Sequence, residues 1–133
     1  MKNEIKVAVL WSIILAGLIV HGLIELIPLF YGTSVVMAGA DGTMPSGDMW
    51  MMLVFYLVPM VFMAFTVLFT CKYLRLLNLL FAGLYTIANA FHFFEHMGMG
   101  FGVQVILLGF VFLVSIALTH SSFRLWKNPS LSE

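Results

Sequence analysis

Five ionisable residues that could do chemistry lie inside long apolar stretches of this sequence. His21 and Glu25 are four residues apart in one stretch, and His92, Glu95 and His96 lie within five residues of another. Residues four apart share one face of a helix. Because an ionisable side chain inside a membrane span is costly, each of these residues is a candidate for a functional site.

The segment from His92 to His96 has the spacing H-x-x-E-H. Two imidazoles one helical turn apart can bind one metal ion, and a nearby carboxylate can take a proton from metal-bound water. In this spacing the segment resembles the motif of the inverted zincins. The resemblance covers five residues, and it implies that His92 and His96 are metal ligands and that Glu95 is the catalytic general base.

The pair on the first stretch is expected to complete this site, with Glu25 or His21 as the remaining protein ligand. A His₂Glu set with an open position is a catalytic zinc arrangement, whereas a set that also includes a third His is more closed. Asn89, one turn before His92, is expected to orient the His92 ring within the cofactor site. A hydrogen-bonded network or proton relay without metal is the alternative for the same residues.

The metal is expected to be a divalent cation, with zinc favoured by the His and Glu donors. Copper is one alternative, because soft thioethers beside imidazoles select Cu(I). Of the ten methionines, seven fall near the histidine side of the spans: Met37, Met44, Met49, Met51, Met52, Met97 and Met99.

Haem b is the other alternative cofactor, held between His21 on one span and His92 or His96 on another. Four small residues near these histidines would leave space for it: Gly17, Gly22, Ala88 and Ala90.

The composition indicates where such a site would be placed. The chain has 133 residues, of which 62% are hydrophobic and 9% are charged, and its mean hydropathy is +1.08. A small soluble domain cannot bury that much apolar surface, and a disordered chain is far more polar. Six basic residues balance six acidic ones, which disfavours a nucleic-acid partner. We therefore expect an all-α integral membrane protein whose main partner is the lipid bilayer.

The apolar stretches predict a four-transmembrane-helix bundle that forms one domain over residues 1–133. Each stretch is long enough to cross a hydrocarbon core of about 30 Å. The expected helices cover about residues 7–31, 49–71, 74–97 and 101–123, with an outer loop at 32–48.

The basic residues set the expected orientation. With four spans, all six fall on the same side of the membrane, which predicts that both termini are cytoplasmic, N-in and C-in. The expected location is a bacterial inner (plasma) membrane. The six residues are Lys2, Lys6, Lys72, Arg75, Arg124 and Lys127.

The depth of the polar residues supports one shared site. At 1.5 Å per residue, His21 lies roughly 21 Å above Val7 and His92 roughly 27 Å above Leu74. Both spans run outward, so the two His/Glu groups are expected in one layer that faces the extracytoplasmic side.

Three functions follow from this layer. The first is a metal-dependent, zinc-type membrane hydrolase that acts on a lipid or another membrane-accessible substrate. The second is a haem- or copper-binding module for redox chemistry or metal handling. The third is a non-catalytic accessory subunit or proton relay, in a homo-oligomer or a larger membrane complex.

Other residues are expected to have packing roles. Asn78 and Tyr85 continue the polar stripe of His92 and are expected to join the first and third spans. Trp11 is expected near a span end, and Cys71 is expected to be a buried thiol at the end of the second span.

Overall fold

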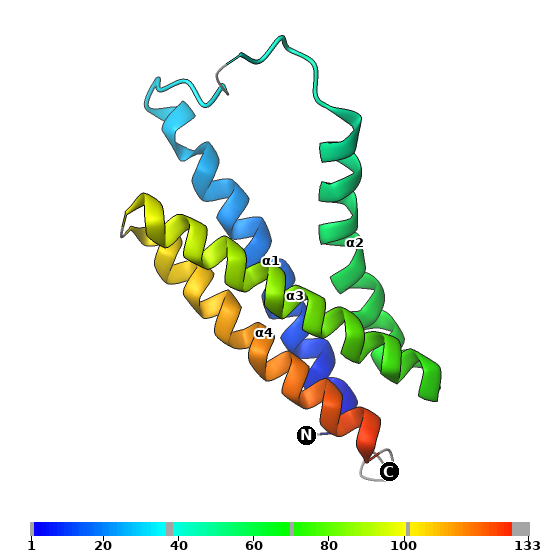
Figure 1. Cartoon of the computed structure of the whole chain (residues 1–133). Coiled ribbons are helices and arrows are strands. Elements are labelled where there is room, and N and C mark those ends of the chain that lie inside the picture. Colours follow the sequence, from blue (N-terminus) through cyan, green and yellow to red (C-terminus); the bar gives the residue numbers. More distant parts are fainter. Residues whose placement is uncertain (1, 37–38, 70, 101, 129–133) are drawn as a thin grey trace.

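The computed structural model describes residues 2–36, 39–69, 71–100 and 102–128. These residues form four helices, which confirms the predicted all-α four-helix bundle (Figure 1). Each helix is long and apolar enough to cross a membrane. The helices are α1 (Asn3–Phe30), α2 (Ser46–Leu68), α3 (Lys72–Met99) and α4 (Val103–Lys127).

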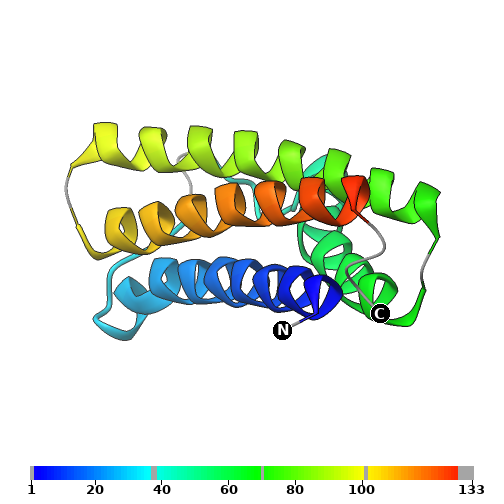
Figure 2. The ribbon, with the colours of Figure 1, turned by 90° about the horizontal axis from the view of Figure 1, so that it is seen from below.

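Helix α4 packs against both α1 and α3, and it lies between them in Figure 2. Helix α2 packs mainly against α1. The first part of α2, residues 46–54, is exposed on every face and stands away from the other helices (Figure 1). We call the end of the bundle where α1 and α3 finish the histidine end, and the opposite end, where the six basic residues lie, the basic end.

The helix ends differ from the expected ones by one to four residues. Helix α1 continues past Pro28 to Phe30, and the Pro28 carbonyl accepts the N–H groups of Tyr31 and Thr33 just beyond the helix end. Helix α2 begins directly after Pro45, whose carbonyl accepts the N–H of Asp48. Position 101, where the fourth span was expected to begin, lies outside the described residues.

The link from α2 to α3 corrects the expectation for Cys71. Helix α2 ends at Leu68, and Cys71 is the exposed N-cap of α3 in an extended conformation. The link contains no Gly or Pro, so the sequence did not locate the turn to the residue. In the link from α1 to α2, the hydroxyl and N–H of Thr43 donate to Asp41 Oδ1, and they hold the pKa of that carboxyl below its usual value.

Trp11 lies in the core of the bundle, eight residues after the start of α1. It is fully buried, stacks on Phe62 with ring centroids 5.7 Å apart, and meets the Tyr85 ring edge-on at 5.1 Å. Its indole N–H donates to Asn78 Oδ1 at 2.7 Å. A buried indole needs such a partner, so the polar stripe on α3 is also what lets this tryptophan enter the core.

The polar stripe of α3 contacts three helices rather than α1 alone. Asn78 Nδ2 donates to Ser122 Oγ on α4 at 2.8 Å, while the Tyr85 hydroxyl donates to the Phe55 carbonyl on α2 at 2.8 Å.

A Cβ at Gly17 of α1 would overlap the Val111 side chain of α4. Gly17 therefore permits the close approach of α1 to α4.

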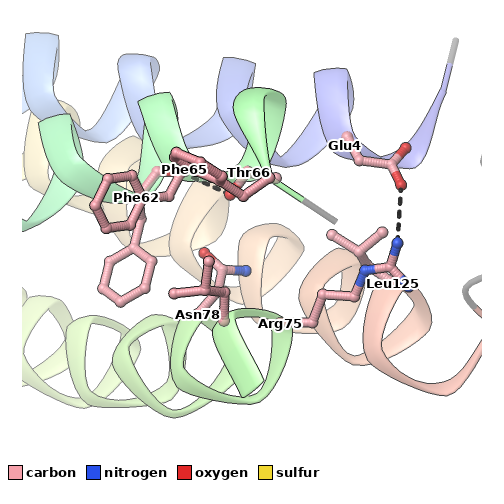
Figure 3. Close-up of a pocket in the computed structure, with 9 residues that line it drawn as sticks. Glu4, Phe62, Phe65, Thr66, Arg75, Asn78 and Leu125 are labelled. Atoms are coloured by element: carbon pink, nitrogen blue, oxygen red, sulfur yellow. Dashed lines mark hydrogen bonds and ion pairs between the residues drawn. The ribbon is translucent and has the colours of Figure 1, made fainter. Parts of the chain in front are cut away.

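Glu4 and Arg75 form an ion pair near the basic end, with Glu4 Oε1 3.7 Å from Arg75 Nη2. Figure 3 shows the two side chains facing each other beside a cavity of about 10 Å³, which is the size of one water molecule. Both side chains are nearly seven-eighths buried. The pair joins the first turns of α1 and α3, which both run from the basic end to the histidine end.

Candidate metal centre

Three of the four histidines meet near the histidine end. His21 from α1 and His92 and His96 from α3 each offer one ring nitrogen, and these nitrogens lie within 4.8 Å of one another. His21 Nε2 is 2.9 Å from His92 Nε2. The fourth histidine, His120, lies on α4 toward the basic end. The parallel course of α1 and α3 thus brings together the three histidines that the depth argument grouped.

In both α3 histidines the Nδ1 atom has a neighbouring acceptor, so Nε2 remains the nitrogen that can bind a metal ion. His96 Nδ1 donates to the His92 carbonyl at 3.1 Å, and His92 Nδ1 lies 3.7 Å from Glu95 Oε2. Metal-bound histidines characteristically direct their other N–H to a carbonyl or carboxylate in this way. His21 differs, since its Nδ1 is buried and has no hydrogen-bond partner among the described residues.

The three nitrogens are spaced closely enough for one small ion. Ligands on a tetrahedral zinc, with bonds of 2.0–2.1 Å, lie about 3.3 Å from each other. The 2.9 Å between His21 Nε2 and His92 Nε2 is a hydrogen-bond distance, so one of the two nitrogens carries a proton. A metal ion would replace that proton after this pair moves apart by a few tenths of an ångström, and nitrogens that are up to 4.8 Å apart would have to approach each other by about 1.5 Å. A haem iron would need the two nitrogens on opposite faces of the porphyrin, whereas His21 Nε2 and His92 Nε2 are in direct hydrogen-bond contact.

The two carboxylates approach the cluster from different sides. Glu25 Oε1 lies 3.3 Å from His21 Nε2 and 3.9 Å from His96 Nε2, on the side of the candidate ligand atoms. Glu95 instead lies beside His92 Nδ1, and its side chain is 70% exposed. The H-x-x-E-H spacing predicted Glu95 as the general base of the site, and Glu25 or His21 was expected as the remaining metal ligand. The rotation of Glu95 away from the face shared by His92 and His96 places it behind one ring instead.

A cavity of about 630 Å³ opens beside the cluster, between α1, α2 and α3. Its polar lining residues are His21, Glu25, Tyr56, Asn89, His92 and Glu95. Apolar residues of all three helices form the rest of the lining. A second cavity of about 430 Å³ reaches His96 on the side of α4. Every sequence-predicted site residue therefore lies at the cluster or lines the larger cavity.

Asn89 lines this cavity but does not hydrogen-bond to His92 within the described structure. The side chain is 3% exposed, and its Nδ2 group has no hydrogen-bond partner in the part of the chain that the structure describes. Glu95 and a backbone carbonyl contact the α3 rings in its place. The Asn89 amide thus remains a donor beside the cavity.

Sequence reasoning did not find the wall that α2 contributes. Met51, Met52, Phe55 and Tyr56 of α2 line the cavity opposite the histidines. Since α2 is apolar on nearly every face, its sequence carries no periodic signal for the side that faces the site. Met37, which was grouped with these methionines, lies outside the described residues.

Comparison of the chain with known protein families, curated proteins and solved structures gave no match. The likeness to the inverted zincins is thus limited to the five residues from His92 to His96.

Proposed function

We propose that this protein is an integral membrane protein with a zinc site and that it acts as a hydrolase. The membrane assignment is supported by the large apolar side chains exposed along all four helices, since soluble monomers rarely expose such extensive apolar surface. The basic end faces the cytoplasm in this proposal, so that the histidine end faces the extracytoplasmic side of a bacterial inner membrane.

The zinc ligands are Nε2 of His21, His92 and His96. The observation that carries this assignment is the convergence of three ring nitrogens from two helices within 4.8 Å, beside a cavity that a substrate can occupy. Three histidines leave the fourth position of a tetrahedral zinc open, which is the arrangement of catalytic rather than structural sites.

Hydrolysis needs a base for the zinc-bound water, and Glu25 is favoured over Glu95 for this role. Glu25 lies on the Nε2 side of two ligands, with its carboxylate half exposed toward the cavity. Glu95 positions His92 through Nδ1, as carboxylates do behind many zinc-bound histidines. Zinc lowers the pKa of its bound water to about 7, so a nearby carboxylate can accept the proton at neutral pH.

Copper(I) is the second candidate because Met51 and Met52 line the same cavity as His21 and His92. Thioethers beside imidazoles are soft ligands that suit Cu(I). If copper is the native metal, replacing both methionines with leucine weakens Cu(I) retention and leaves zinc retention unchanged.

Metal analysis of protein purified without a polyhistidine tag tests the proposal. We expect one zinc per chain, loss of the metal in His21→Ala and His92→Ala, and full retention in the matched control His120→Ala. Equal metal content in all four proteins, or none in any, would contradict the zinc site.

A further inference from the structure

The cavity beside the histidines has both polar and apolar lining residues. The polar ones are His21, His92, the two carboxylates, Asn89 and Tyr56. The apolar ones are Leu18, Met51, Met52, Phe55, Ala88 and Phe91, of which three form the wall on α2. This distribution suits a molecule with one polar group and a hydrocarbon chain rather than an ion or a polar metabolite.

The cavity opens sideways, toward the region that lipid would occupy. Residues 46–54 of α2 are exposed on every face, and this part of the helix stands apart from α3 in Figure 1. Phe91 lines the cavity and is still 74% exposed. A lipid chain can therefore reach the histidines between α2 and α3 without crossing the aqueous phase.

The depth of the site matches the acyl carbonyl groups of a bilayer. Helix α3 has 28 residues, which makes it about 42 Å long, so about 6 Å extends beyond each side of a 30 Å hydrocarbon core. His92, seven residues before the end of α3, then lies roughly 5 Å inside the hydrocarbon boundary, and Asn89 lies roughly 9 Å inside it. The ester and amide carbonyls of membrane lipids lie at that boundary, so a carbonyl must enter the cavity by several ångströms to reach Asn89.

Asn89 supplies the group that such a carbonyl would need. Its Nδ2 is a buried donor without a partner among the described residues, which is a costly state that a ligand acceptor would relieve. Rotation about the last side-chain bond exchanges the positions of the amide nitrogen and oxygen, so either group can face the cavity.

We infer that the cavity binds the carbonyl end of an acylated membrane lipid, with Asn89 Nδ2 donating a hydrogen bond to the carbonyl oxygen and the acyl chain leaving between α2 and α3. The cleavage that follows rests on the proposed zinc hydrolase. With zinc held by the three histidines, water at the metal would supply the oxygen that bonds to the carbonyl carbon as the acyl C–O or C–N bond breaks. The proton taken by Glu25 passes to the departing alcohol or amine, and the other product is a fatty acid.

Photo-crosslinking tests the binding without relying on turnover. The probe is a phosphatidylcholine with a diazirine near the carbonyl end of one acyl chain, in phosphatidylcholine–phosphatidylglycerol nanodiscs that hold the whole protein. We expect crosslinks to concentrate on the α2 and α3 residues that line the cavity. In Asn89→Leu the yield of the site-specific crosslink is expected to fall about tenfold, which corresponds to the loss of one hydrogen bond to a buried donor.

Ala88→Phe fills the cavity and is expected to remove the site-specific crosslink, whereas Ala64→Phe, on an exposed part of α2, leaves it unchanged. Size-exclusion chromatography verifies that each variant is folded, and Asn89→Leu repeats the test if Ala88→Phe does not fold. The nanodisc lipids are already esters in excess over the probe, so competition by an added N-acyl amide or free fatty acid shows whether an amide or an acid is preferred to an ester.

Crosslinks spread evenly over all lipid-facing helices and unaffected by Ala88→Phe and Asn89→Leu would overturn the inference, even if zinc binds. A specific crosslink that persists in chelator-treated protein supports lipid binding, even if the protein proves to hold no zinc. The lipid-binding inference and the zinc proposal can thus be contradicted independently of each other.

Discussion

Two carboxylates line one cavity and approach the histidines from different sides. Glu25 faces the Nε2 atoms, and Glu95 lies behind His92. We predict that Glu25→Gln keeps the zinc but lowers hydrolysis of para-nitrophenyl octanoate by about a hundredfold or more, because the base is lost. Glu95→Gln is predicted to weaken zinc affinity by roughly 10–100-fold and to keep most turnover at saturating zinc.

These isosteric variants control for each other, since both remove one charge from the same cavity. Zinc titration and initial rates measured on the same samples separate the two effects. The opposite result, in which Glu95→Gln abolishes turnover with zinc retained, would restore the base role that the H-x-x-E-H spacing gave to Glu95.

At the scale of the helices, the buried bonds of Asn78 hold α1 and α4 to α3. Asn78→Leu leaves the Trp11 indole N–H and the Ser122 hydroxyl without this partner. We predict that the free energy of unfolding falls by about 1–3 kcal/mol because of the unsatisfied indole donor alone, and that the Tm in detergent is lower. Leu77→Ala on the exposed side of α3 is the control and is expected to shift the Tm much less. An equal shift in both variants would contradict the structural role of Asn78.

At the scale of the whole molecule, the proposed orientation can be tested with the single cysteine. Cys71 is exposed in the link between α2 and α3, at the basic end. We predict that a membrane-impermeant maleimide labels Cys71 in inverted membrane vesicles and not in right-side-out ones. Ser34→Cys in a Cys71→Ser background, placed in the link at the histidine end, should give the reverse pattern. Labelling of Cys71 in right-side-out vesicles and not in inverted ones would place the histidines on the cytoplasmic side.

The sequence predicted the helices and the histidine cluster because both depend on simple periodicity. Apolar runs marked the spans, and the four-residue spacing with matched depth grouped His21, His92 and His96. It did not place the wall formed by α2, because that helix is apolar on nearly every face. The sequence also could not pair Glu4 with Arg75, because the two residues are 71 positions apart and only the fold brings them together.

The central claim is that three histidines from two helices hold one metal ion. X-ray absorption at the zinc edge of zinc-loaded protein measures this directly. The account predicts three imidazole nitrogens and one oxygen at about 2.0–2.1 Å from the metal. A spectrum with no imidazole scattering, or one that His21→Ala leaves unchanged, would contradict it.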